Sequence, residues 1–156
     1  MNFEEIMNNS EVEFGDMQPQ PFLLGLLSAF DNRYQACADS FFAEITWKQF
    51  FAIICINLCK EPPTINQLSS IMGSSHQNVK QILIKLAKKD FVVMVPDGKD
   101  RRKQRVLLTK TCQEFCERND RHSQEIVSRI FNGIDNDKLM ITIQTIIMME
   151  RNLSEL

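Results

Sequence analysis

The fold is decided by one stretch, SSHQNVKQILIKLAKKDFVVMVPDGKDRRKQRVLLTK, which covers residues 74–110. Its first part repeats apolar residues at steps of three and four, the pattern of one buried helix face, at Val79, Ile82, Leu83 and Leu86. Two apolar runs rich in β-branched residues follow, at 91–95 and 104–108, and they predict strands. The Pro-Asp-Gly sequence at 96–98 indicates a turn between them. We therefore expect a helix at 75–89 followed by a basic β-hairpin.

Two shorter helices are predicted upstream, at 47–59 and 65–72, and all three helices open on the same motif. A hydroxyl residue is followed three positions later by glutamine, so the two side chains can satisfy each other's free backbone amides in a capping box. The pairs are Thr46 with Gln49, Thr64 with Gln67, and Ser74 with Gln77. Gly73 stands where a glycine in the left-handed conformation would end the second helix. The second and third helices therefore predict a helix-turn-helix.

Longer helical patterns flank this region. The first runs from residue 22 to about 43 or 44, and two others close the chain, at about 109–131 and 135–153. Thr109 and Asp135 are the expected N-caps of the closing helices. The last helix is apolar on several sides and needs more cover than one small domain supplies. We expect a second copy of the chain to provide that cover.

These patterns together predict a mainly α fold with a small β-hairpin wing. A winged helix-turn-helix domain is assigned to residues 46–108. A helical dimerisation region is assigned to residues 22–45 and 109–156. Residues 1–21 lack periodicity, carry five acids and no lysine or arginine, and are expected to form a flexible acidic arm.

Composition and charge narrow the class of protein. The 156 residues are 44% apolar and 24% charged, which is typical of one globular domain. The apolar runs fall well short of the ~20 residues of a membrane span, and the acidic N-terminus does not resemble a secretory signal, so a cytoplasmic protein is expected. The net charge is −2, but residues 74–110 hold ten bases and three acids, a net charge of +7. Such a concentration favours a localised polyanion site, the alternative being a solvated charged face.

Catalytic and cofactor motifs are lacking in the sequence. The phosphate-binding and dinucleotide-binding glycine patterns, the GxSxG nucleophile motif, HExxH and CxxC do not occur. We therefore expect no enzyme activity, no cofactor and no metal. Five cysteines without an export signal argue against disulfides, and small buried residues are the simpler interpretation. A thiol-based redox sensor, or a thiol enzyme, stays open as an alternative because a thiol with a lowered pKa is reactive.

The hairpin carries Asp97-Gly98-Lys99-Asp100-Arg101-Arg102, with Leu108-Thr109 at the start of the next helix. This pattern resembles the wing of the multiple-antibiotic-resistance regulator (MarR) family of bacterial transcription factors. Residues 83–92 resemble that family's end of the recognition helix and first wing strand, and the likeness covers about 22–154.

The sequence departs from the family pattern at several positions. Asp90 stands where the family usually has glycine, and Cys112 stands where a glycine often follows Leu-Thr. Met94 and Val95 replace frequent arginines, so the first wing strand should make fewer phosphate contacts. Residues 22–30 lack the early cysteine of the peroxide-sensing branch, which disfavours that activity.

The resemblance implies where DNA would be bound. The candidate residues of the recognition helix are Ser75, His76, Gln77, Asn78, Lys80, Gln81 and Lys85, with the two lysines on phosphates and the others at base edges. Each could instead only cap or solubilise the helix. The candidate wing residues are Lys99, Arg101, Arg102 and Lys103. Arg102 would enter the minor groove, oriented by either Asp97 or Asp100 through a charge-assisted pair.

The resemblance also implies partners. The chain is expected to be a homodimeric regulator, in this family most often a repressor, that binds a pseudo-palindromic operator in double-stranded DNA. A small-molecule effector would bind near Tyr34, Trp47, Phe50 and Phe51, although these rings could equally be core aromatics. The alternative function is a winged-helix protein-interaction module without DNA binding.

Overall fold

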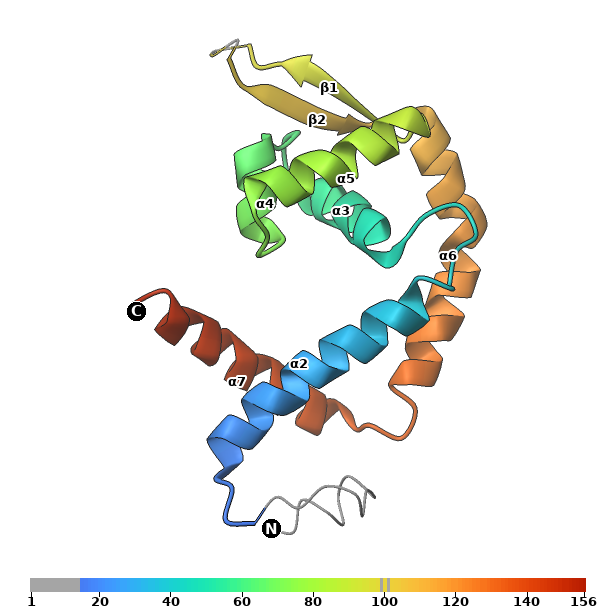
Figure 1. Ribbon diagram of the computed structural model, residues 1–156. Helices are drawn as coiled ribbons and strands as arrows, with labels where there is room; N and C mark the ends of the chain where they lie inside the picture. Colours follow the sequence, from blue (N-terminus) through green and yellow to red (C-terminus); the bar gives the residue numbers. More distant parts are fainter. Residues whose placement is uncertain (1–14, 99, 101) are drawn as a thin grey trace. The chain divides into compact units, whose positions relative to one another are not determined.

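Figure 1 shows the computed structural model of the chain. The structure describes residues 15–98, 100 and 102–156, and within these residues the chain forms six helices and one two-stranded antiparallel sheet. The elements are α2 (Pro19–Ala38), α3 (Trp47–Leu58), α4 (Ile65–Ile71), α5 (His76–Lys88), β1 (Val92–Pro96), β2 (Gln104–Leu108), α6 (Lys110–Ile130) and α7 (Asn136–Leu153). The predicted fold, mainly α with a β-hairpin wing, is confirmed.

The chain divides after Thr109 into two compact units. The first unit contains α2 to β2, and the second contains α6 and α7. The predicted assignments of residues 22–45 and 109–156 to a dimerisation region, and of residues 46–108 to a DNA-binding domain, stay predictions. None of the described helices is both long and apolar enough to cross a membrane.

The core of the first unit lies where α3, α4 and α5 pack on one another and on the hairpin. Each element contributes to this core the apolar residues that the sequence pattern predicts on its buried face. The most deeply buried side chains of these elements include those of Ala52, Ile53, Leu68, Val79, Leu83, Leu86 and Val106. Because α5 buries only this apolar stripe, its opposite face is left in solvent.

The hairpin is held in register by five pairs, from Val92 opposite Leu108 to Pro96 opposite Gln104. The first strand begins and ends one residue later than the predicted 91–95, and the second matches its predicted bounds. A third segment adds to this sheet, because the amide of Val106 donates to the carbonyl of Pro63, 2.9 Å away. The hairpin is therefore tied to the chain that leads into α4.

Helix α2 differs most from its predicted bounds of 22 to 43 or 44. It begins at Pro19 and ends at Ala38. Proline is tolerated in the first helical turn, where an amide would lack a partner and the fixed φ already suits the helix. The prolines that suggested an arm therefore start the helix instead. Residues 1–14 of the predicted arm lie outside the described residues.

The capping predictions were right for two helices and wrong for the third. Thr46 with Gln49 and Thr64 with Gln67 form complete capping boxes at α3 and α4. At α5 the N-cap is Ser75, whose hydroxyl accepts from the amide of Asn78 at 3.2 Å, and not Ser74. Ser74 still contributes, because its hydroxyl accepts from the side chain of Asn78. Because the hydroxyl of Ser75 caps the helix in place of that of Ser74, α5 starts one residue later than predicted.

Two positions that flank α5 adopt the left-handed conformation, and for Gly73 the sequence predicted it. Gly73, between α4 and α5, has φ 59°, and Asp90, after α5, has φ 58°. A short polar residue such as aspartate tolerates this region better than most residues do. The turn that usually takes glycine therefore forms here with aspartate.

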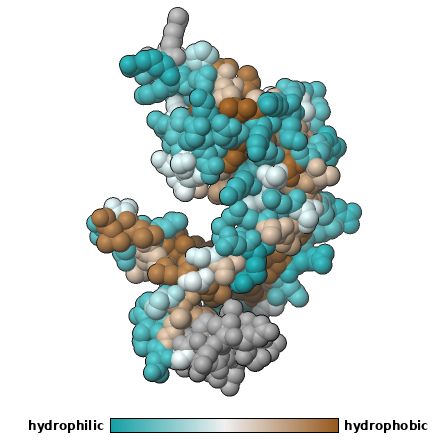
Figure 2. Space-filling model, in the orientation of Figure 1, coloured by the Kyte–Doolittle hydropathy of each residue, from teal (hydrophilic) through white to brown (hydrophobic). Residues whose placement is uncertain are grey.

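The second unit carries an unusual amount of exposed apolar surface. Helix α7 is capped by Asp135, whose carboxylate accepts from the amide of Lys138 at 2.9 Å. No residue of α7 is fully buried, although all 18 residues of this helix are described. Apolar side chains along it show as brown surface in Figure 2. The exposed ones include Met140, Ile141, Ile143, Ile147, Met148 and Leu153.

Candidate nucleic-acid interface

Helix α5 buries apolar residues on one face and exposes polar and basic residues on the other. Val79, Leu83 and Leu86 are buried, and the seven side chains predicted to face DNA are all exposed: Ser75, His76, Gln77, Asn78, Lys80, Gln81 and Lys85. Hydrogen-bonding groups lie toward the start of the helix, and Lys85 and Lys88 lie in its last turn. A helix with this division can enter a major groove, which is about 12 Å wide.

The tip of the hairpin holds its arginine in a defined position. The Nε of Arg102 lies 3.1 Å from Oδ1 of Asp100, and its Nη2 lies 3.4 Å from Oδ2. Lys103 approaches the same carboxylate at 3.8 Å. The side chain of Arg102 nevertheless stays 91% exposed, so it is oriented without being buried. Lys99 and Arg101, also predicted to bind DNA, lie outside the described residues.

The charge on Asp100 is stabilised by this pairing. Hydrogen bonds from the side chain and then the backbone of Arg102 hold the pKa of the Asp100 carboxyl below its ordinary value of 3.8. Nearby Lys103 acts in the same direction. The carboxylate is therefore ionised at neutral pH and available to orient the guanidinium.

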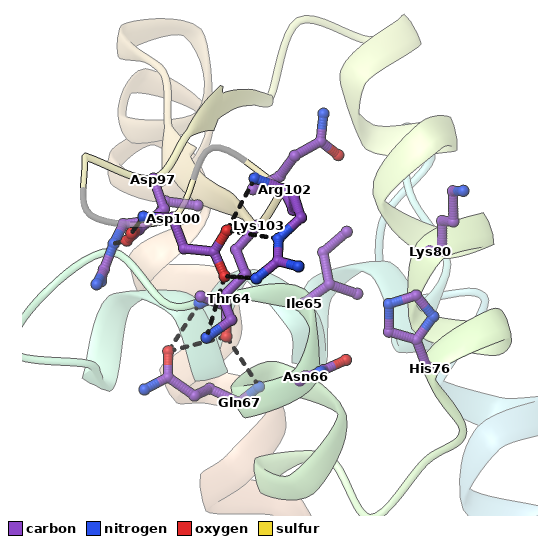
Figure 3. A pocket seen from close by; sticks show the side chains of 12 residues that line it. Thr64, Ile65, Asn66, Gln67, His76, Lys80, Asp97, Asp100, Arg102 and Lys103 are labelled. Atoms are coloured by element: carbon purple, nitrogen blue, oxygen red, sulfur yellow. Dashed lines mark hydrogen bonds and ion pairs between the residues drawn. The ribbon is translucent and has the colours of Figure 1, made fainter.

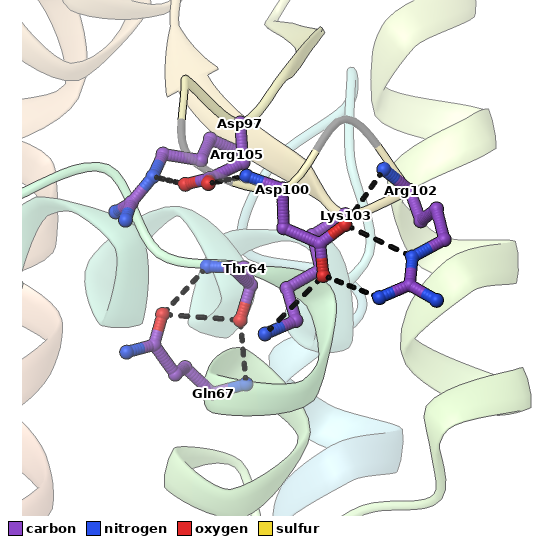
Figure 4. A network of polar contacts seen from close by, with 7 residues as sticks. All are labelled: Thr64, Gln67, Asp97, Asp100, Arg102, Lys103 and Arg105. Carbon is purple, nitrogen blue, oxygen red and sulfur yellow. Dashed lines mark hydrogen bonds and ion pairs between the residues drawn. The ribbon is translucent and has the colours of Figure 1, made fainter.

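Asp97, the other candidate for orienting Arg102, has a different partner. Its Oδ2 accepts from Nε of Arg105, and its Oδ1 accepts from the amide of Asp100 at 2.8 Å (Figure 4). Its own amide donates to the carbonyl of Lys103 at 2.9 Å. Of the two acids, Asp100 pairs with Arg102, and Asp97 shapes the turn that carries this pair.

Arg105 connects the hairpin to the segment before α4. Its Nη1 donates to the carbonyl of Pro62 at 2.7 Å, and its backbone forms a β-bridge with Thr64. Glu61, which is 82% exposed, lies 3.8 Å away and makes only a loose ion pair. Arg105 is one of the ten bases of residues 74–110, and its sequence position indicated no particular role. The sequence held no signal for its role, because its partner Pro62 is 43 residues away.

A groove lies between α5, the start of α4 and the hairpin (Figure 3). It has a volume of about 620 Å³. Residues from all three elements line it: Thr64, Ile65, Asn66, Gln67, His76, Lys80, Asp97, Asp100, Arg102, Lys103, Gln104 and Arg105. The concave surface therefore combines four cationic side chains, the two carboxylates of Asp97 and Asp100, and several amide and hydroxyl groups.

The groove brings together part of the predicted site. His76 and Lys80 of α5 lie across it from Arg102 and Lys103 of the wing (Figure 3). The other predicted residues of α5 do not line it: Ser75, Gln77, Asn78, Gln81 and Lys85. The first turn of α4 lines it instead, although the sequence predicted only a helix cap there. Nothing in the sequence indicated that its polar residues belong to a binding site, because the capping box already accounted for Thr64 and Gln67.

The rings predicted to line an effector pocket are in mutual contact. Tyr34 and Trp47 meet edge to face with centroids 4.8 Å apart, and Phe51 stacks on Trp47 at 5.9 Å. Phe50 lies 6.2 Å from Trp47. All four rings are half-buried, and burial raises the pKa of the Tyr34 hydroxyl. Their role in binding an effector stays a prediction.

The cysteines are free thiols in the described part of the chain. Cys55 and Cys112 are buried, and burial raises the pKa of Cys112 to about 12 and also raises the pKa values of Cys55 and Cys116. Higher pKa values make thiols less reactive, which disfavours the redox alternative at these positions. The described residues contain no group of three or more His, Cys, Asp or Glu arranged as metal ligands.

Solved structures with the same fold are transcriptional regulators. A MarR/EmrR family regulator from Acinetobacter sp. ADP1 is 12% identical, with 90% of this chain and all of that chain covered and a TM-score of 0.79. A MarR regulator from Methanosarcina mazei Go1 is 21% identical, with 87% and 99% covered and a TM-score of 0.72. BpsR from Bordetella bronchiseptica, whose DNA binding is regulated by 6-hydroxynicotinic acid, is 17% identical, with 91% and 99% covered and a TM-score of 0.70.

No protein-family model matches the sequence. The structural likeness nevertheless spans most of the chain and nearly all of each regulator. The chain therefore has the fold of the MarR-family transcriptional regulators, in agreement with the resemblance noted in the wing.

Proposed function

We propose that this protein is a DNA-binding transcriptional regulator that acts as a homodimer in the cytoplasm. The observation that carries the proposal is the groove with basic groups on both sides. Lys80 of α5 faces Arg102 and Lys103 of the wing across it, on a fold shared with transcriptional regulators. This arrangement suits a recognition helix in the major groove and a wing in the adjacent minor groove.

Each part of the interface has its own task in this proposal. The polar side chains of α5 bind base edges, where glutamine and asparagine can contact adenine through two hydrogen bonds. Lys80 and Lys85 bind phosphates, which position the helix without selecting sequence. Arg102 enters the minor groove, where a narrow A·T tract concentrates negative potential.

The dimer is inferred from the apolar surface of the second unit. Helix α7 leaves Ile141, Met148 and Leu153 more than half exposed, and a second copy of the chain would cover them. A two-fold dimer would present two recognition helices to successive major grooves, about 34 Å or one DNA turn apart. The operator is therefore pseudo-palindromic.

Regulation by a small molecule is the finer part of the proposal. The aromatic cluster of Tyr34, Trp47, Phe50 and Phe51 could stack on a flat aromatic or lipophilic anion, and BpsR responds to 6-hydroxynicotinic acid. An effector that binds the DNA-free geometry better would release the operator, as in a repressor.

Fluorescence anisotropy across a salt series tests the central claim. The wild type would be titrated with DNA from its own upstream region and with scrambled DNA, beside Arg102→Ala. We expect tighter binding to the upstream DNA. We also expect Arg102→Ala to weaken binding and to lower the salt slope by about one per lost phosphate contact in each subunit.

A matched control is Arg121→Ala, which removes an exposed arginine of α6 that is paired with Glu125. It should leave both affinity and salt slope near the wild-type values. Absence of binding to any DNA at low salt would contradict the regulator proposal. It would favour the alternative, a winged-helix module for protein interaction, which the apolar Met94 and Val95 of β1 make conceivable.

A further inference from the structure

Asp97 and Arg105 form an ion pair where the two strands of the wing meet the turn that carries Arg102. The Asp97 side chain is 7% exposed and that of Arg105 is 29% exposed. A partly buried charge-assisted pair is stronger than a surface pair, and its geometry is better defined. This pair can therefore fix the position of the groups attached to it.

The attached groups lie on both sides of the pair. On one side, the guanidinium of Arg105 donates to the carbonyl of Pro62, two residues before the N-cap of α4. On the other side, Oδ1 of Asp97 accepts from the amide of Asp100, whose carboxylate in turn holds Arg102 (Figure 4). Contacts therefore run continuously from the start of the helix-turn-helix to the tip of the wing.

We infer that Arg105 is a positioning residue: with Asp97 it sets the angle of the wing and the place of Arg102 relative to the recognition helix, without binding DNA itself. This inference rests on the proposed function. Arg105 is suited to the role because its planar guanidinium reaches two partners at once, the carboxylate of Asp97 and the carbonyl of Pro62. Lysine keeps the charge but lacks this fork of donors.

The direction in which DNA affinity changes distinguishes the positioning role from a simple effect of charge. Asp97→Asn removes a negative charge close to DNA, so electrostatics alone predicts tighter binding. The positioning role predicts weaker binding, because the partner of Arg105 loses its charge. Glu61→Gln is the matched control, since it also removes one negative charge beside Arg105 but from an exposed, loose pair.

DNA affinity would be measured by anisotropy for Asp97→Asn, Arg105→Lys and Glu61→Gln. We expect the first two to bind about tenfold more weakly, the loss expected for one charge-assisted hydrogen bond, with an unchanged salt slope. Glu61→Gln should stay within about twofold of the wild type. Thermal unfolding of each variant would confirm that the protein is folded at the assay temperature.

A double variant tests whether the effect passes through Arg102. If it does, Arg105→Lys combined with Arg102→Ala should bind no more weakly than Arg102→Ala alone. A loss of general stability would instead add to the effect of Arg102→Ala. In solution, the Nε proton of Arg105 should exchange slowly with water in the wild type and faster in Asp97→Asn.

Three results would overturn the positioning role while leaving the proposed function in place. They are tighter DNA binding by Asp97→Asn, additive losses in the double variant, and a salt slope that falls by about one per subunit in Arg105→Gln, which would mean a direct phosphate contact. Wild-type protein that binds no DNA would instead refute the proposed function, and the positioning role with it.

Discussion

Both carboxylate oxygens of Asp100 accept hydrogen bonds from the guanidinium of Arg102, yet the arginine side chain stays almost completely exposed to solvent. The two residues are only two positions apart, so the contact is made within one turn of the chain. An ion pair this exposed contributes little to stability. Its value lies in presenting a long, flexible side chain in one orientation before any ligand arrives.

The first prediction concerns the titration of Asp100. Since pairing with Arg102 lowers its folded-state pKa below 3.8, the stabilisation from this pair is fully present above about that pH. It is lost as the pH falls through the lower folded-state pKa. A carbon-detected NMR titration of the carboxyl group should show this low midpoint, and Arg102→Ala should raise it. An equal midpoint in both proteins would contradict the pairing.

Two glycines should respond to alanine in opposite directions. Gly73 has φ 59°, so Gly73→Ala should lower the free energy of unfolding by about 1–2 kcal/mol. Gly25 lies inside α2, where Gly25→Ala should raise it by about 0.5–1 kcal/mol. An added Cβ meets no neighbour within 4 Å at either site, so the backbone conformation alone sets the sign. Urea unfolding measures both, and the same sign for both would refute this explanation.

Thiol reactivity should follow burial. Cys37 is exposed and should react first with iodoacetamide, whereas Cys55 and Cys112 should react last. Because burial raises the pKa of Cys112 to about 12, this thiol is almost entirely protonated at pH 8. Mass spectrometry of peptides over time gives the order, and Cys37→Ser should remove the first phase. Early labelling of Cys112 would reopen the redox-sensor alternative.

The apolar surface of α7 should determine whether the protein is a dimer or a monomer in solution. Ile141 and Met148 are each 63% exposed and lie seven residues apart, hence on one side of the helix. Replacing both with lysine should shift the protein from dimer toward monomer, because two charges would have to be buried at the contact. Light scattering after size-exclusion chromatography measures this. Glu150→Lys, at an exposed polar position on the opposite side of the same helix, is the control and should remain a dimer.

Sequence periodicity and capping predicted the helix-turn-helix and hairpin well, because both depend on local chemistry. The capping boxes at Thr46 and Thr64 and the left-handed turn at Asp90 need only near neighbours. The role of Arg105 could not be predicted, because its partner Pro62 is 43 residues away in the sequence. The choice of Ser75 over Ser74 as the cap of α5 depended on two equivalent hydroxyls that sequence alone could not separate.

The hydrogen bond from Val106 to Pro63 has a consequence for aggregation. Free strand edges can recruit strands from other chains. In this hairpin one side of β2 is paired with β1, and its other side meets Pro63 and Thr64. Only the five-residue outer edge of β1 remains, and it ends at Pro96, which has no amide hydrogen to offer. The wing therefore projects from the domain with one short free edge in place of two, which reduces the backbone available for intermolecular β-sheet growth.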